Sequence, residues 1–145
     1  MVKKIWKPHV TVAAVAEKDG RFLIVEETVD QQLVLNQPAG HLDPGETLFD
    51  AVIRETFEET AHRFTPKGVV GVYRWTHVYR DRTYIVFAFY GDITGFEPNQ
   101  PLDDGIERAL WLSRDELGQH RERWRTAMVG QVFDDYLAGR RFPLE

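Results

Sequence analysis

The sequence has no cysteine among its 145 residues. This absence excludes disulfide bonds, thiolate nucleophiles and zinc sites built from cysteine. Because disulfides are typical of oxidising compartments, a chain without cysteine is expected to function in the reducing environment of the cytoplasm.

Long apolar segments are also missing. No stretch approaches the roughly 18 apolar residues that a membrane-spanning helix needs. The N-terminal stretch carries Lys3 and Lys4, but Pro8 and His9 interrupt the apolar run that a signal peptide requires. We therefore expect neither a signal peptide nor a membrane partner.

Basic residues are in deficit, with 18 Lys and Arg against 23 Asp and Glu and a net charge of −5. A protein that covers nucleic acid needs many Lys and Arg residues to contact phosphates, so no nucleic-acid partner is expected. A phosphorylated small molecule must then be bound by metal ions or by a local basic cluster. The length predicts a single domain over 1–145, with a monomer as the default.

The shortage of bases is most acute in 46–59, where Arg54 is the only basic residue. If this segment is helical, Glu55 and Glu59 lie one turn apart, and such a like-charge pair destabilises a helix by roughly 0.2–0.5 kcal/mol. One explanation is an acidic helix face in contact with water. The other is a hard divalent cation, Mg²⁺ or Mn²⁺, held by carboxylate oxygens and by substrate phosphate. The acids of the segment are Glu46, Asp50, Glu55, Glu58 and Glu59.

The residues before these acids predict a loop, and the acids themselves have the spacing of a helix. Thr47 followed by Asp50 is typical of a capping box, which places the start of the helix near Thr47. At about 100° per residue, Phe49, Ile53 and Phe57 form one apolar stripe. We expect this stripe, with Val52 at its edge, to be buried against a core. The residues that predict the loop are Pro38, Gly40, Pro44 and Gly45.

This loop and helix resemble the signature of the Nudix hydrolases. The sequence departs from the family pattern at Ala61, where a glycine is usual, and at Thr56 and His62, where aliphatic residues are commoner. Because Ala61 lacks the ease with which glycine adopts left-handed conformations, we expect the helix to continue a little past Thr60. The matching positions are Gly40, Glu46, Arg54, Glu55, Glu58 and Glu59.

The rest of the chain predicts alternating strands and two more helical segments. Asp19-Gly20 predicts a hairpin turn between two strands, and Ser113 with Glu116 is typical of a second capping box. A last helix is expected over 121–137, ended by Gly139. The pattern indicates a mixed sheet between helices, an α/β (α+β) fold, and the resemblance implies the Nudix α/β/α sandwich with a mixed central sheet. Expected strands cover 9–17, 21–27, 33–35, 69–77, 83–90 and 109–112, and 95–105 is expected to be a loop.

The resemblance also implies roles for individual residues. Glu58 and Glu59 are expected to bind Mg²⁺, with Glu55 as a further ligand or as a base. The backbone carbonyl of Ala39 is expected to be another ligand, and Arg54 to orient a glutamate within the catalytic group. The remaining assignments are Gly40 and Glu46 as structural residues of the motif, and Asp104 and Glu107, with Asp103 behind them, as candidates for an extra metal-binding carboxylate.

Aromatic and basic residues near the second hairpin are candidates for substrate binding. Trp75 is preferred over Tyr73 and Tyr79 for stacking on a nucleobase or pyrimidine, and Arg74 is a candidate for contacting phosphate. The alternative for each is core packing or an exposed surface position. We expect His9 and His41 to be structural, and Arg80 and Arg82 share the alternatives given for Arg74.

Four longer stretches, 7–13, 22–28, 36–42 and 141–145, are similar to those of a phosphatase within the Nudix family. This similarity implies Mg²⁺-dependent release of orthophosphate from nucleoside tri- and diphosphates and from hydroxymethylpyrimidine diphosphate, with Mn²⁺ as a substitute. One alternative is the same chemistry on a damaged nucleotide, ADP-ribose or a dinucleoside polyphosphate. Another is a non-catalytic Nudix-fold binding module, although the presence of Glu55, Glu58 and Glu59 together favours an enzyme.

Overall fold

The computed structural model describes residues 3–144, apart from the side chain of Val78, so the stretch 141–145 ends one residue outside it. Its centre is a mixed eight-stranded sheet in the order β3-β2-β1-β6-β5-β8, with β4 paired to β1 and β7 to β2. None of the helices in residues 3–144 is long and apolar enough to span a membrane. The strands are β1 (His9–Lys18), β2 (Arg21–Val29), β3 (Gln32–Asn36), β4 (Ala39–His41), β5 (His62–His77), β6 (Arg82–Phe96), β7 (Ile106–Leu112) and β8 (Phe142–Pro143).

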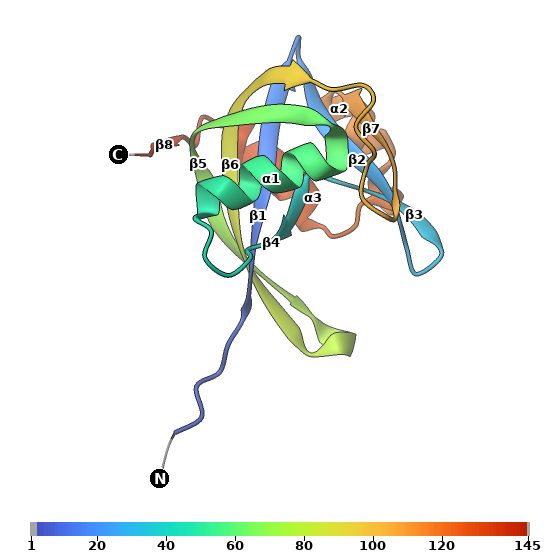
Figure 1. Ribbon diagram of the computed structural model, residues 1–145. Helices are drawn as coiled ribbons and strands as arrows, with labels where there is room; N and C mark the ends of the chain where they lie inside the picture. Colours follow the sequence, from blue (N-terminus) through green and yellow to red (C-terminus); the bar gives the residue numbers. More distant parts are fainter. Residues whose placement is uncertain (1–2, 145) are drawn as a thin grey trace.

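Helices cover both faces of this sheet, with α1 across one face and α3 behind the other (Figure 1). Strand β1 explains the arrangement, because successive side chains of a strand point to opposite faces. Val12 and Ala14 pack in the same cluster as Val52 of α1, whereas Val15 packs in the cluster that contains Phe133 of α3. The predicted α/β/α sandwich is therefore confirmed. The helices are α1 (Leu48–Thr60), α2 (Arg114–Gln119) and α3 (Met128–Leu137), with single 3₁₀ turns η1 (Val78–Arg80) and η2 (Arg121–Arg123).

The predicted first hairpin is present, and both residues of its turn have positive φ, 53° at Asp19 and 77° at Gly20. The second hairpin, β5 with β6, is longer than the sequence predicted, because β5 begins at His62 and β6 runs to Phe96. The register of this hairpin shifts near Pro66, Gly68 and Gly71. Residues that normally interrupt a strand thus lie at bulges, and pairing continues beyond them.

Helix α1 begins where predicted, with the reciprocal capping box of Thr47 and Asp50. Its end was predicted wrongly, because Ala61 itself takes the left-handed conformation, with φ 58°, and its N–H donates to the carbonyl of Phe57. The helix therefore stops at Thr60 without glycine.

The predicted buried stripe of α1 was wrong for Phe49 and Ile53, whereas Val52 at its edge is buried as expected. Phe49 and Ile53 are each 39% exposed, whereas the helix buries a face of smaller and polar side chains. Phe49 lies at the margin of this face, edge-on to Phe89 with ring centroids 5.5 Å apart. The small residues of this face let the helix backbone approach the sheet. Glu59, which is also buried, lines the cavity described below. The buried residues are Ala51, Val52, Thr56, Glu59 and Thr60.

Two further differences between the predicted and the observed structure lie near the pocket. The segment 38–41 was predicted to be a loop, but Ala39–His41 forms β4, which pairs with β1. The last helix begins at Met128 rather than at 121, because Trp124 bridges to Leu35 and the N–H of Arg125 donates to the Leu35 carbonyl at 2.9 Å. The second capping box, at Ser113 and Glu116, is confirmed.

Candidate active site

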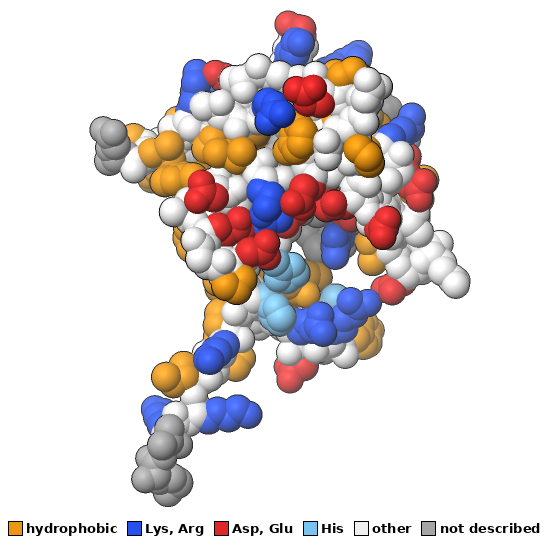
Figure 2. All heavy atoms as spheres, in the orientation of Figure 1, with side chains coloured by type: hydrophobic (Ala, Val, Ile, Leu, Met, Phe, Trp, Pro, Cys, Tyr) orange, Lys and Arg blue, Asp and Glu red, His pale blue; other side chains and the backbone are white. Residues whose placement is uncertain are grey.

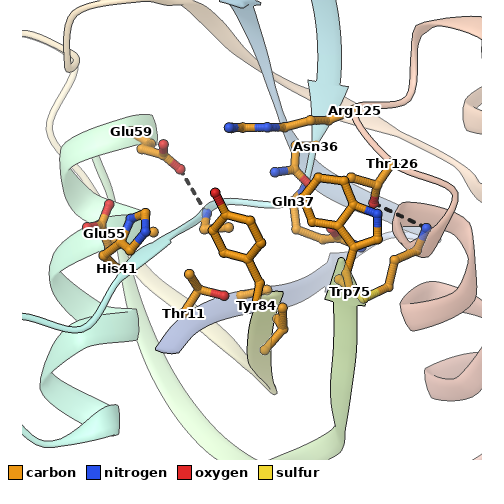
Figure 3. Close-up of a pocket in the computed structure, with 15 residues that line it drawn as sticks. Thr11, Asn36, Gln37, His41, Glu55, Glu59, Trp75, Tyr84, Arg125 and Thr126 are labelled. Atoms are coloured by element: carbon orange, nitrogen blue, oxygen red, sulfur yellow. Dashed lines mark hydrogen bonds between the residues drawn. The ribbon is translucent and has the colours of Figure 1, made fainter. Parts of the chain in front are cut away.

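A cavity of about 320 Å³ lies between α1, the sheet and the segment that leads into α3 (Figure 3). One wall is acidic and comes from α1, and the opposite wall is formed by aromatic, polar and basic side chains of β5, β6 and the residues before α3. Acidic side chains gather over α1 in the space-filling view, with histidine, lysine and arginine side chains next to them around a hollow (Figure 2). The lining residues are Thr11, Ala13, Asn36, Gln37, Ala39, Gly40, His41, Glu55, Glu59, Trp75, Tyr84, Val86, Arg125, Thr126 and Met128.

Glu59 is the most deeply buried acid of this wall, with 9% of its surface exposed. Its Oε1 accepts a hydrogen bond of 2.8 Å from the backbone N–H of Ala39 in β4. Burial raises the pKa of Glu59 to about 9; the Ala39 N–H opposes this change, and the negative charges of Glu27, Glu55 and Asp103 add to it. The protein alone therefore does little to stabilise the ionised form of Glu59.

Glu55 lies one turn before Glu59 and lines the same cavity. Burial raises its pKa, although a hydrogen bond from Arg54 opposes the shift. The carboxyl carbon of Glu55 would lie 2.0 Å from a β-carbon at position 40. Gly40 is therefore required for close approach between the Glu55 carboxylate and the backbone of β4.

Three carboxylates converge beside this wall. Single oxygen atoms of Glu55, Glu58 and Asp103 all lie within 4.8 Å of one another. The N–H of Asp103 donates to the carbonyl of Glu58 at 3.0 Å, which holds the loop after β6 against the end of α1. A compact set of carboxylate oxygens has the donor chemistry that Mg²⁺ and Mn²⁺ prefer, so the residues present fit such an ion.

The structure does not bring the other predicted loop acids into this group. Neither Asp104 nor Glu107 belongs to the cluster of carboxylates found among residues 3–144. Glu107 instead accepts a hydrogen bond of 2.9 Å from the hydroxyl of Thr28. Asp103, which the sequence ranked behind these two, is the loop acid that joins Glu55 and Glu58.

Arg54 lies among the acids of the motif, as expected for a residue that orients glutamates. Its Nη1 donates to Glu55 at 2.8 Å and to Glu58 at 3.3 Å. Its Nη2 and Nε donate to Glu46, whose Oε1 also accepts the N–H of Asp43. Hydrogen bonding to Glu46 and Glu55 raises the pKa of Arg54 despite burial. Glu46 thus connects the loop before α1 to the helix through Arg54.

The opposite wall contains Trp75, which stacks on Tyr84 with ring centroids 5.3 Å apart and planes inclined by 26°. Arg74 is exposed and is absent from the cavity lining, because neighbouring residues of a strand face opposite sides. Tyr73 donates to Asp135 at 2.7 Å and packs against the core, and Tyr79 is almost fully exposed. Among the predicted substrate-binding residues, Trp75 is the one that faces the cavity.

Sequence reasoning gave no binding role to several residues of the cavity wall, among them His41, Tyr84 and Arg125. His41, which the sequence predicted to be structural, lines the cavity, and partial burial together with the nearby charges of His9, Arg125 and Arg82 lowers its pKa. Arg125 lines the cavity from the far end of the chain. No spacing rule connects Arg125 with the motif of 40–59, so only the three-dimensional fold could place it there.

Comparison with known proteins identifies the family. The NUDIX domain family matches residues 6–132. The chain is 38% identical over 142 residues to the phosphatase NudJ of Escherichia coli K12, a match that covers 97% of this chain and 91% of NudJ. A NUDIX hydrolase from Nitrosomonas europaea is 47% identical and superposes with a TM-score of 0.93, covering 95% of this chain and 94% of that one.

A more distant structure shares the fold alone. It is a bifunctional NMN adenylyltransferase/ADP ribose pyrophosphatase from Francisella tularensis, complexed with AMP and a Mn ion. It is 21% identical, has a TM-score of 0.71, and is matched over 94% of this chain and 43% of its own. The family match, the two similar proteins and the acidic motif on α1 agree, and the chain therefore belongs to the Nudix family.

Proposed function

We propose that this hydrolase of phosphoanhydride bonds is a Mg²⁺-dependent phosphatase, with Mn²⁺ as a substitute. Its proposed substrates are nucleoside tri- and diphosphates and hydroxymethylpyrimidine diphosphate, from which it releases orthophosphate. The convergence of Glu55, Glu58 and Asp103 beside a cavity with an aromatic wall carries this proposal. The 38% identity to the phosphatase NudJ over 97% of the chain supports the choice of reaction.

The donor set suggests how the residues divide the work. Glu55, Glu58 and Asp103 would hold the metal, and Glu59, whose Oε1 accepts the N–H of Ala39, is a further proposed ligand. A bound Mg²⁺ offsets the charge of the phosphoanhydride and assists the attack of water. Arg54 keeps the carboxylates of Glu55 and Glu58 in place, and the carbonyl of Ala39 remains a candidate ligand.

The aromatic wall suggests how the organic part of the substrate is bound. The stacked rings of Trp75 and Tyr84 present a flat apolar surface at the cavity. A base or pyrimidine ring that stacks there gains about 1–3 kcal/mol. The phosphate chain then extends from this wall to the acidic wall on α1.

The same proposal includes the setting of the enzyme. We propose a single domain over 1–145 that works as a monomer in the cytoplasm on a small phosphorylated molecule, without a nucleic-acid or membrane partner. The absence of cysteine and the net charge of −5 support this setting. Sedimentation of the purified protein tests the monomer directly.

The test is orthophosphate release by the purified protein with Mg²⁺, over nucleoside tri- and diphosphates, hydroxymethylpyrimidine diphosphate, ADP-ribose and a dinucleoside polyphosphate. We expect direct orthophosphate from the first three and loss of that activity with a chelator. If products form only from ADP-ribose or the dinucleoside polyphosphate, the proposed substrates are wrong and these compounds replace them. No turnover with Mg²⁺ or Mn²⁺ would favour a non-catalytic binding module.

Two loop variants give a matched control for the metal site. Asp103→Asn removes the loop carboxylate that lies with Glu55 and Glu58, whereas Glu107→Gln removes one that lies outside this group. We expect Asp103→Asn to reduce phosphate release strongly and Glu107→Gln to leave it close to that of the wild type. A strong loss of phosphate release in Glu107→Gln but not in Asp103→Asn would make Glu107, and not Asp103, the additional metal ligand.

A further inference from the structure

Two of the described residues that line the cavity have basic side chains, Arg125 and His41, and Arg125 is the only arginine or lysine among them. It comes from the short segment between η2 and α3, and its guanidinium extends into the cavity toward the side on which Glu59 lies (Figure 3). Neither the acidic motif nor the aromatic wall explains why an arginine is held at this place.

The backbone around Arg125 is fixed on both sides. Its own N–H donates to the carbonyl of Leu35 at 2.9 Å. The indole N–H of Trp124 donates to the carbonyl of Leu117 at 2.9 Å, and the hydroxyl of Thr126 accepts the N–H of Met128 at 3.2 Å. The backbone at Arg125 is therefore held against β3, α2 and α3. Little backbone conformational entropy is lost when the arginine binds a ligand.

Glu27 fixes the side chain itself. Its Oε1 accepts a hydrogen bond of 2.8 Å from Nη1 of Arg125. Glu27 lies where the pairing of β2 with β7 shifts register, and such bulges redirect side chains.

Most of the donors of this arginine are left for a ligand. A guanidinium has five N–H donors in a planar fork. Within residues 3–144, the side-chain hydrogen bond of Arg125 uses Nη1 alone, and 45% of the side chain is exposed. Fixed forks of this kind bind phosphate oxygens with two parallel hydrogen bonds.

A comparison with the neighbouring ion pairs separates binding from structural pairing. Arg108 and Arg123 both pair with Glu26 on the same strand, and neither lines the cavity. The carboxylate of Glu26 is paired with two arginines, so a structural role is enough to explain both ion pairs. Arg125 differs because it is held by one acid and directed into the cavity.

We propose that Arg125 is a substrate-binding residue that contacts non-bridging oxygens of the phosphate chain from the segment before α3, a different wall of the cavity from that of Glu55. Glu27 is its positioning residue. This inference rests on the proposed function, since it assigns a second contact for the same phosphorylated substrate. The phosphate chain is then held between the acidic wall and Arg125.

The test uses inorganic pyrophosphate as the probe and measures its binding by calorimetry in the presence of a chelator, with KM for a nucleoside diphosphate measured alongside with Mg²⁺. Arg125→Met removes the fork and keeps an unbranched apolar side chain. We expect pyrophosphate affinity to fall roughly 10- to 100-fold and KM to rise by a similar factor, as for loss of a charge-assisted hydrogen bond. Arg125→Lys should give a smaller loss, because it keeps the charge without the fork.

Arg108→Met is the matched control, because it removes an arginine from the adjacent ion pair outside the cavity. We expect its pyrophosphate affinity to equal that of the wild type. Equal weakening in the Arg108 and Arg125 variants, unchanged affinity in Arg125→Met, or no measurable pyrophosphate binding by the wild type would each overturn the inference. Circular dichroism verifies that all three variants remain folded.

The two proposals fail in different ways. If the wild type releases no phosphate from any substrate but Arg125→Met still weakens pyrophosphate binding, the proposed function fails and the binding role remains. If the wild type is active and Arg125→Met changes neither affinity nor KM, the function remains and the role of Arg125 is refuted.

Discussion

Two groups of buried acids lie close together in this protein and differ in how their charge is compensated. On β2, Glu26 pairs with Arg108 and Arg123, and Glu27 pairs with Arg125. On α1, Glu55 shares Arg54 with other acids, and Glu59 receives the backbone N–H of Ala39.

The pKa values follow this difference. Burial on its own raises the pKa of Glu26, but hydrogen bonds from Arg123 and Arg108 outweigh burial and leave the pKa below its usual range. Burial raises the pKa of both Glu55 and Glu59, and their hydrogen bonds do not compensate for it. Glu26 is thus stable as an anion within the protein, whereas Glu55 and Glu59 need an additional cation, which is the reason to place a metal there.

The largest expected effect comes from neutralising the α1 acids. Glu58→Gln should reduce phosphate release on the order of 10²–10⁴-fold, because it removes a carboxylate of the proposed metal site. Glu59→Gln should reduce it comparably. Without metal, the unfolding temperature of either variant should equal or exceed that of the wild type, because a repulsive or poorly solvated charge is lost. Retained activity in both variants would exclude a catalytic role for this face of α1.

The second effect concerns metal binding to the folded protein. Mg²⁺ at 100 times its dissociation constant should stabilise the wild type by about 2.7 kcal/mol, since it binds the native state alone. This corresponds to a rise in unfolding temperature of about 5–10 °C for a domain of this size. A chelator should reverse the shift, and Glu58→Gln should lack it. An equal shift in the variant would mean that the ion binds elsewhere.

A smaller effect is expected from the compensated acids. Glu26→Gln should lower the free energy of unfolding by about 1–3 kcal/mol, because two charge-assisted hydrogen bonds to a side chain that is 8% exposed are weakened. Denaturant unfolding measures this change. Phosphate release should stay near that of the wild type, and a loss of activity without a loss of stability would show that the two groups of acids do not divide as described.

The smallest effect is a pH dependence. Because the pKa of Glu26 is lower in the folded protein than its usual value of 4.5, its stabilising contribution is present above that value and is lost as the pH falls through the folded pKa. The difference in unfolding free energy between the wild type and Glu26→Gln should therefore be largest above 4.5, the usual pKa of the group, and shrink as the pH falls below it. A difference that stays constant with pH would contradict the ionic origin of the stabilisation.

Local patterns predicted much of the fold. The capping box at Thr47 and the turn at Asp19-Gly20 depend on neighbouring residues and were confirmed. Tertiary packing decided the rest. Phe49 and Ile53 were wrongly assigned to the buried face of α1, because periodicity identifies a face without showing which one lies on the sheet. The late start of α3 was missed, because it depends on a bridge between Trp124 and the distant Leu35.

The site was predictable to the extent that it is local. Glu55, Glu58 and Glu59 lie within two helical turns, and their spacing alone places them together. Asp103 joins the carboxylate cluster, and Arg125 lines the cavity, through loops whose positions depend on contacts with Glu58 and Leu35. The family resemblance indicated Asp104 and Glu107 for the metal, and the second hairpin offered Arg74 for phosphate. The structure places none of these three in the cavity or carboxylate cluster of the residues it describes.

The most direct test of the difference between the two groups of acids is Mn²⁺ binding, measured by calorimetry on the wild type, Glu58→Gln and Glu26→Gln. If the α1 acids form the metal site, the wild type and Glu26→Gln bind Mn²⁺ with the same affinity, and Glu58→Gln binds at least about tenfold more weakly. Equal Mn²⁺ affinity in all three proteins, or a greater loss of affinity in Glu26→Gln, would contradict the assignment of the metal site to the α1 acids.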